Sequence, residues 1–470
     1  MTGLEGHSVD VPARAVEDFS ARIAGPTLQP GDAGFEEAVT IWNGMISKRP
    51  SLVVQPISMN DVREAIGFAR SHGLLLSIKG GGHNIAGTSL ADGGLTLDMG
   101  RMRRVEVDPE RRIARVGPGC ILGDVDPATQ QYGLATVLGQ VTQTGVAGLT
   151  LGGGFGYLTR RFGSTVDNLQ EVEIVTADGN IRRAAEDEHE DLFWALRGGG
   201  GNFGVATRFT YRLHRVGPEV TGGRIFWDAE SSDEVVRLFQ DLAEVTPKEL
   251  TLSLAMHLAP PAPFIPETLH GRPVVSITGC HTGELSKAAK DLAPIRSVGR
   301  PIADLMTQRS YVEQQSLLDP IYPKGLHYYW KSEFFPGLSE DLLRTCVEHA
   351  DRLTSPMSHI ILLQLGGALA ELDTSTPFGN RDAAFVFFGV GAWSPDSPEP
   401  ERHRGWVRSA WESVRPYSTG GNYVNAQTAD EDESRMKEAY RDNLDRLRSV
   451  KATYDPDNLF RVNRNISPIR

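Results

Sequence analysis

Short apolar runs and one amphipathic stretch dominate the beginning of the chain. Residues 51–56 (SLVVQP) and 74–78 (LLLSI) have the length and composition of short buried strands. Between them, residues 59–73 place apolar side chains at helical spacing and end at Gly73, a residue type that commonly follows a helix. We therefore expect a strand, a helix and a strand over this segment, after a helical entry segment within residues 1–50.

Turn residues between further strand-like runs predict two β-hairpins. Residues 103–108 (RRVEVD) and 112–117 (RIARVG) flank a short turn. The second hairpin spans residues 171–184, where Asp178-Gly179 is a dipeptide typical of hairpin turns.

A helix is expected next, over residues 191–197 (DLFWALR), followed by a glycine-rich loop and a strand over residues 205–213. Along that strand, one set of alternate positions is mostly apolar and the positions between them are more polar, which is the pattern of a half-buried strand. These positions are Val205, Thr207, Phe209, Tyr211 and Leu213.

Beyond Pro218 the strands and helices become longer. Apolar runs alternate with amphipathic helical patterns, which indicates an α+β sheet with helices packed on one face. The strand-like runs cover residues 250–258, 273–280, 359–367 and 385–393, and the helical patterns cover 233–245, 340–353 and 404–414. The last 35 residues or so predict one continuous helix that stops before Pro456. Its apolar stripe is Met436, Tyr440, Leu444, Leu447 and Val450.

Composition excludes several functional classes. The 470 residues predict about three domains or two large ones, and 48 basic against 60 acidic side chains give a net charge of −12. A nucleic-acid-binding protein would carry a basic stripe, so no nucleic-acid partner is expected. The chain has no apolar stretch of membrane-spanning length and no secretion signal, so we expect no membrane partner and a cytoplasmic protein. Three cysteines without a C-x-x-C pair argue against a disulfide scaffold and a thiolate metal site.

Three glycine-rich loops, at residues 80–82, 152–156 and 198–204, are the strongest chemical signal. Gly199, Gly201 and Gly204 match a dinucleotide-binding spacing, but they follow a predicted helix and precede a strand, the reverse of a Rossmann turn. Glycine lets a backbone approach a ligand closely and present its N–H groups. The three loops together predict a site that grips something large and flat through main-chain contacts.

Five motifs occur together and in order, at residues 79–84 (KGGGHN), 145–156 (GVAGLTLGGGFG), 162–169 (FGSTVDNL), 196–205 (LRGGGGNFGV) and 454–468 (YDPDNLFRVNRNISP). With this combination the chain resembles the berberine-bridge-enzyme-like FAD-linked oxidases of the vanillyl-alcohol-oxidase superfamily. The resemblance implies an α+β, two-domain fold. An FAD-binding domain would span residues 1–216, with a PCMH-type core at about 46–216. A substrate-binding domain with an antiparallel sheet and helices would span 217–420, and 421–470 would return to the FAD domain.

The same resemblance implies FAD as cofactor, attached covalently through His83 to the flavin 8α-methyl group. Taken alone, a histidine after a glycine loop is more simply a residue that bonds a backbone carbonyl. The residues expected to line FAD are Gly80, Gly81, Gly82, His83, Asn84, Gly145, Gly148, Leu151, Gly152, Gly153, Gly154, Gly156, Asp167, Asn168, Gly201, Val205, Asn463 and Asn465.

Two departures from the family pattern bear on the chemistry. Many members have a second flavin link, from a cysteine at the position of Val141, so a single link through His83 is expected here. The family often places a tyrosine base at the position of Ala426; Tyr423 lies nearby but would face the opposite side if the segment is a strand. Gln364 and Tyr423 stay as candidate catalytic residues. Other possible substitutes, none favoured, are Glu371 and the cluster His327, Tyr328 and Tyr329.

The resemblance implies that Thr144 borders the flavin face at which oxygen reacts, where a small residue leaves room for O2. With this threonine and the Trp-Asn-Gly segment beginning at Trp42, the chain resembles the bacterial enterocin-pathway flavoprotein branch of the family. The resemblance implies an FAD-dependent oxidase that takes hydride from a small-molecule, secondary-metabolite substrate and is reoxidised by O2. The alternatives are a flavin-N5-oxide oxygenase acting on a polyketide-like substrate and a flavin-binding protein without turnover. No metal is expected, and the substrate and oligomeric state are left open.

Overall fold

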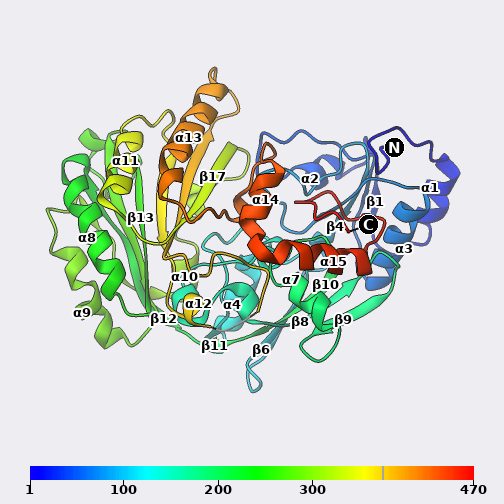
Figure 1. The fold of residues 1–470 in the computed structure, drawn as a ribbon, viewed down its shortest axis with the longest axis horizontal. Helices are drawn as coiled ribbons and strands as arrows, with labels where there is room; N and C mark the ends of the chain where they lie inside the picture. The colour runs from blue at the N-terminus through cyan, green and yellow to red at the C-terminus, as the bar shows by residue number, and fades with distance from the viewer. Residues whose placement is uncertain (373–374, 470) are drawn as a thin grey trace.

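The computed structural model describes residues 1–372 and 375–469. The two ends of the chain lie together in one lobe, and the middle of the chain forms the other (Figure 1). We refer to them as the terminal lobe and the central lobe. Among these residues we find no helix whose length and hydropathy suit a membrane span.

A four-stranded sheet near the N-terminus forms as the apolar runs predict. Its strand order is β1-β2-β4-β3, with β4 parallel to both β2 and β3. Helix α3 joins β2 to β3, and Ser58 caps its first turn by accepting a hydrogen bond from the Asp61 N–H at 3.2 Å. The bounds are α1 Ala13–Ser20, β1 Thr27–Leu28, α2 Phe35–Val39, β2 Leu52–Val54, α3 Met59–Ser71, β3 Leu76–Lys79 and β4 Leu95–Asp98.

A second sheet of the terminal lobe contains both predicted hairpins, in the order β5-β6-β10-β8-β9. Its central strand, β10, is more deeply buried than its alternating pattern predicts, and only Arg208 and Arg212 are exposed along it. Its edges pair with β6 and β8, and its side chains pack into two different apolar clusters, so both faces of β10 are covered. The bounds are β5 Val105–Asp108, β6 Ile113–Val116, α4 Leu122–Gln130, β7 Leu134–Ala135, α5 Val146–Leu151, α6 Thr159–Phe162, β8 Leu169–Val175, β9 Ile181–Ala185, α7 Glu190–Leu196, β10 Val205–Arg212 and β11 His214–Arg215.

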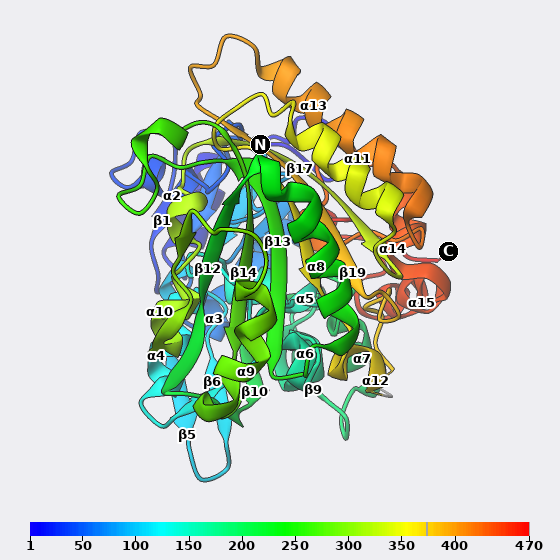
Figure 2. The same ribbon diagram turned by 90° about the vertical axis from the view of Figure 1, so that its left-hand side faces the viewer.

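The central lobe is built on a large antiparallel sheet, in the order β15-β12-β14-β13-β18-β19-β17 with β16 paired to β12. Helices cover its outer face (Figure 2), as predicted. The inner face is left to the terminal lobe. The bounds are β12 Glu219–Asp228, α8 Ser232–Val245, β13 Leu250–Leu258, β14 Pro273–His281, α9 Leu285–Arg296, β15 Ala303–Asp304, β16 Thr307–Ser310, α10 Tyr311–Gln315, β17 His327–Phe335, α11 Glu340–Ala350, β18 His359–Gln364, α12 Ala368–Glu371, β19 Phe385–Trp393 and α13 Pro400–Val414.

The prediction of one continuous C-terminal helix is wrong. Helices α14 (Glu433–Tyr440) and α15 (Leu444–Tyr454) are separated at Arg441, whose φ of 49° is incompatible with a right-handed helix. The Arg441 guanidinium donates to Asp382 at 3.0 Å, and this contact with the central lobe accompanies the break. The apolar stripe is real, but tertiary contacts divide the helix that carries it.

A buried lysine ties α15 to the glycine loop at residues 198–204. Lys451 Nζ lies 2.6 Å from Asp455 Oδ2 and donates to the carbonyls of Asn202 (2.7 Å) and Phe460 (3.0 Å). Both charged side chains are fully buried, so each depends on the other for compensation.

We expect Lys451→Met to lower the free energy of unfolding by about 3 kcal/mol, because it leaves the Asp455 carboxylate buried without its cation. Urea denaturation followed by tryptophan fluorescence would measure the change. Arg448→Met on the same helix removes an exposed pair with Asp445 and should cost less than about 1 kcal/mol. Equal losses in the two variants would contradict the structural role of Lys451.

Candidate active site

A cavity of about 780 Å³ lies between loops of the terminal lobe and the inner face of the large sheet. The loop side is mostly backbone and small residues, whereas the sheet side is made of larger side chains. Lining residues on the loop side include Gly80–Ile85, Gly139–Val141, Thr144, Gly145, Ala147–Leu149, Gly200–Asn202 and Val462–Arg464. Those on the sheet side include Arg224, Phe226, Ser253, His257, Thr278, Trp330, His359, Ile361, Leu363 and Phe388.

Two kinds of glycine form the loop side. Gly81 and Gly145 touch each other through their backbones, and a Cβ on either would overlap the other residue. Gly148 and Gly201 have nothing within 4 Å of the position a Cβ would take, although both line the cavity. The first pair brings the two loops together, and the second pair leaves open space beside the backbone.

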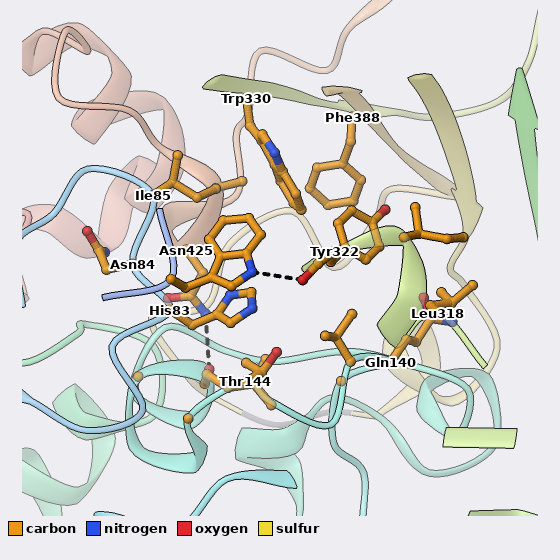
Figure 3. A pocket seen from close by; sticks show the side chains of 18 of the residues that line it. His83, Asn84, Ile85, Gln140, Thr144, Leu318, Tyr322, Trp330, Phe388 and Asn425 are labelled. Atoms are coloured by element: carbon orange, nitrogen blue, oxygen red, sulfur yellow. Dashed lines mark hydrogen bonds between the residues drawn. The ribbon is translucent and has the colours of Figure 1, made fainter. Parts of the chain in front are cut away.

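His83 is presented to the cavity in a neutral state. Its ring stacks on Trp42 with centroids 4.1 Å apart, and its Nε2 atom is buried without a hydrogen-bond partner. Burial lowers the pKa of His83 to about 4. His83 therefore carries an imidazole that is uncharged at neutral pH and faces the same space as Thr144, Tyr322 and Trp330 (Figure 3).

The other predicted cofactor residues on the cavity wall are Gly80, Gly82, Asn84, Leu151 and Asn463. Four other predicted cofactor residues, Gly152, Gly153, Gly154 and Gly156, are not on this wall. A Cβ on Gly152 would overlap Asn425, one on Gly153 would overlap Phe378, one on Gly154 would overlap Thr165, and one on Gly156 would overlap Leu138. These four glycines allow close packing of the chain on itself.

Four more of the predicted cofactor residues lie off the wall. The Asp167 carboxylate pairs with Arg381 at 2.5 Å, and these contacts hold its pKa below the usual range despite burial. Asn168 donates to the carbonyls of Phe162 (3.0 Å) and Ser164 (2.8 Å). The remaining two are Val205, which packs in the apolar core beside the first sheet, and Asn465, which donates to Ser467 at 3.4 Å.

The segment around Tyr423 is not a strand. Residues Val424–Ala426 form a single 3₁₀ turn, so Tyr423 and Ala426 both line the cavity. The Tyr423 hydroxyl accepts a hydrogen bond from Asn425 Nδ2 at 2.9 Å, and burial raises the pKa of Tyr423 to about 12. Thr144 and Val141 are on the wall as well.

Gln364, a candidate catalytic residue from the sequence, lies away from the cavity. Alternate residues of β18 point to opposite faces, and Ile361 and Leu363 line the cavity. Gln364 therefore faces the helices, where its Nε2 donates to the Ala243 carbonyl on α8 at 3.2 Å.

The other suggested substitutes are also engaged elsewhere, and none of them is among the lining residues. Glu371 pairs with Lys248 on the surface, Tyr328 stacks on Trp42, and Tyr329 donates to Asp430 at 2.7 Å. His327 is directly opposite Trp393 in the pairing of β17 with β19.

Two histidines and a tyrosine on the wall have no motif that the sequence could reveal. His257 and His359 are direct neighbours across strands β13 and β18. His359 Nδ1 lies 3.0 Å from the Met357 carbonyl and must donate to it, so Nε2 accepts from the Tyr322 hydroxyl at 2.9 Å. Burial lowers the pKa of His359 to about 4, which keeps this acceptor neutral. Only the register of the sheet brings these groups together.

Comparison with known proteins decides the family. The "FAD binding domain" family matches residues 50–185, and the "Berberine and berberine like" family matches residues 422–467. The (R)-6-hydroxynicotine oxidase of Paenarthrobacter nicotinovorans is 30% identical over 460 residues, covering 95% of this chain and 97% of that protein. The chain belongs to the berberine-bridge-enzyme-like FAD-linked oxidases.

Solved structures of family members have the same fold. The 6-hydroxy-D-nicotine oxidase of Arthrobacter nicotinovorans superposes with a TM-score of 0.84 at 28% identity, covering 95% of this chain and 98% of that one. Glucooligosaccharide oxidase of Acremonium strictum superposes with a TM-score of 0.84 at 25% identity, covering 96% and 99%. The FAD of that oxidase carries a 6-S-cysteinyl and an 8α-N1-histidyl link.

The cavity of this family member fits FAD by its own geometry. Besides His83 Nε2, two further buried atoms on the loop side of the wall have no partner, namely Gln140 Nε2 and Asn463 Oδ1. The same side of the cavity has open space beside Gly148 and Gly201. Within residues 1–372 and 375–469, no cluster of His, Cys, Asp and Glu could hold a metal ion.

We expect Gly148→Val to weaken FAD binding roughly tenfold or more, because the added methyl groups would project into the cofactor space. The ratio of flavin to protein absorbance after purification would measure the effect. Gly67→Val is the matched control, since Gly67 is also helical with open space beside it but lies off the cavity wall. Stoichiometric flavin in Gly148→Val would show that this space is not used by FAD.

Proposed function

We propose that the chain oxidises a small organic molecule, with FAD attached through His83 and O2 as the final electron acceptor. The observation that carries the proposal is the neutral imidazole of His83 on the cavity wall. When bound, FAD supplies the chemistry by accepting hydride from the substrate and passing electrons to O2. The protein holds the substrate, excludes water and takes up a proton.

The link to FAD is single in this proposal. Val141 occupies the position at which the family pattern places a second, cysteinyl link, and it lines the cavity. The cysteines Cys120, Cys280 and Cys346 are all buried, and none of them is a wall residue. A thioether to the flavin therefore has no sulfur donor here.

Tyr322 and His359 together supply a proton acceptor in place of the tyrosine base of the family, whose position is occupied here by Ala426. The Tyr322 hydroxyl donates to His359 Nε2, so its lone pairs are free to accept a proton from a substrate hydroxyl or amine. The phenol proton can then move to the neutral imidazole, and the tyrosine does not need to become an anion in its buried site. Trp42 holds this tyrosine near His83, because Trp42 Nε1 donates to the Tyr322 carbonyl at 3.0 Å.

The wall favours a bulky, flat, apolar substrate over a sugar. Trp330, Phe388, Phe155 and Tyr423 gather on one part of the cavity, with Trp330 and Phe388 in a T-shaped contact at 6.0 Å. Such walls bind aromatic rings by burial and edge contacts. This supports a secondary-metabolite substrate.

Thr144 borders the same space, and its small size leaves room for O2 beside the flavin. The resemblance to the enterocin-pathway flavoprotein branch implies an oxygenase alternative, and Thr144 on the cavity wall is the residue that keeps it as a second candidate. The fate of the oxygen atoms separates the two. An oxidase returns hydrogen peroxide, whereas an oxygenase places labelled oxygen from O2 in the product.

We expect acid denaturation to leave flavin fluorescence on the wild-type polypeptide and to release it from His83→Ala. Gel electrophoresis under ultraviolet light and the mass of the intact chain would show this. His7→Ala, which changes an exposed histidine, should keep the flavin attached. Free FAD from the wild type would refute the covalent link, and a chain without flavin in any state would refute the oxidase itself.

We expect Tyr322→Phe to slow flavin reduction roughly a hundredfold, because the substrate proton loses its acceptor. Anaerobic stopped-flow absorbance with a substrate found by O2 uptake would measure it. Tyr328→Phe is the control, since its hydroxyl donates to the Pro323 carbonyl away from the cavity wall. Unchanged reduction in Tyr322→Phe would exclude the proposed proton path. A wild type that no candidate substrate reduces would instead favour a flavin-binding protein without turnover.

A further inference from the structure

Arg224 places a positive charge in a cavity wall that contains no acid. Its strand, β12, belongs to the large sheet, and the side chain lines the cavity. The described residues of the wall include no aspartate or glutamate, and Arg224 takes part in no ion pair among the described residues. Its Nε atom is buried without a hydrogen-bond partner.

Neighbouring side chains hold the guanidinium in a fixed orientation. Arg224 Nη2 donates to His257 Nε2 at 3.0 Å and to Ser276 Oγ at 2.8 Å. His257 Nδ1 must donate to the Leu258 carbonyl at 2.8 Å, so its Nε2 is an acceptor for the arginine. The Phe226 ring lies below, with its centroid 4.9 Å from Arg224 Cζ. Neutral partners thus position the cation without neutralising it.

Arg224 is half-buried and has no counter-ion among the described residues, and its partial loss of solvent lowers the pKa of Arg224 to about 10. A folded protein that keeps such a group at a ligand cavity has a guanidinium ready to bind an anion. Guanidinium binds carboxylates with two parallel hydrogen bonds, which suits an orienting contact.

The flavin does not account for this charge. The glycine loops and His83 are on the loop side of the cavity, whereas Arg224 is on the sheet side. A series of contacts runs from the flavin link toward Arg224. Trp42 hydrogen-bonds to Tyr322, and Tyr322 hydrogen-bonds to His359. His359 is in turn the cross-strand neighbour of His257. Arg224 bonds to the last residue of that series, so Trp42, Tyr322, His359 and His257 stand between it and His83 in this chain of contacts.

We propose that Arg224 binds a carboxylate of the substrate, so that the enzyme oxidises an organic acid with a flat apolar body. The aromatic wall holds the ring system near the flavin, and Arg224 fixes the acidic end beyond it. That the bound acid is a substrate rests on the proposed function, but binding of a carboxylate at Arg224 does not depend on turnover.

Binding of paired probes to the holoenzyme tests the proposal. The probes are 3-phenylpropanoate, 2-naphthoate and salicylate, each compared with its neutral carboxamide by calorimetry and by the flavin absorbance change. We expect the acids to bind the wild type more tightly than the amides. In Arg224→Met the acids should bind roughly tenfold to a hundredfold more weakly, with the amides unchanged. Arg224→Lys should keep part of the preference.

Arg309→Met is the matched control. Arg309 also has a buried, unpartnered Nε and is on β16, the strand paired with β12, but it lies off the cavity wall. The Arg309→Met variant should bind the acids more tightly than the amides, as the wild type does. Equal binding of acids and amides, no binding of any acid, or a preference that survives in Arg224→Met would overturn the proposal.

Inorganic phosphate and chloride are further probes. If either binds the wild type as tightly as the acids and is lost in Arg224→Met, the site holds a structural ion and the substrate inference is wrong. Each variant's flavin content is measured in parallel. A preference for acids in a protein with noncovalent flavin would support the Arg224 site while rejecting the His83 link, so the two proposals fail separately.

Discussion

The stack of His83, Trp42 and Tyr328 holds the active site together, because it joins a loop of the terminal lobe to the sheet of the central lobe. Trp42 lies between the two rings, 4.1 Å from His83 and 3.7 Å from Tyr328. Asn43 strengthens the same joint, since its amide donates to the carbonyls of Ile85 (2.9 Å) and Tyr328 (3.0 Å). Moving this segment would shift the flavin attachment relative to the substrate wall, so both depend on one buried tryptophan.

This joint brings together two surfaces that recognise ligands in different ways. The loop side works through backbone, and its glycines either press against each other, as Gly81 and Gly145 do, or leave space, as Gly148 does. The sheet side works through side chains placed by strand alternation. A cofactor that every family member shares suits a backbone cradle, because main-chain groups tolerate sequence change. Substrate choice suits the sheet, where single substitutions alter the wall without disturbing the fold.

Elements set by residues close together in the chain could be predicted from the sequence, whereas side-chain neighbours set by the register of the large sheet could not. Helix α3, both hairpins and the loop with His83 follow from spacing and turn residues that lie close together in the chain. A glycine-rich stretch by itself does not separate ligand contact from chain packing, and Gly154, for example, faces Thr165. His257 and His359 could not be paired from the sequence, since 102 residues separate them and only the sheet register makes them neighbours. The break at Arg441 likewise accompanies a contact with Asp382 in the other lobe, which no local pattern reveals.

Charge links the two ends of the substrate wall. The pKa of His359 is lowered mainly by burial, and the positive charge of Arg224 lowers it further. A carboxylate bound at Arg224 would cancel that second effect, so the pKa of His359 would rise when an acid substrate binds. The imidazole would then accept the Tyr322 proton more readily with substrate present than without it. Arg224 therefore has two roles in this proposal, since it selects the anion and makes the basicity of His359 depend on anion binding.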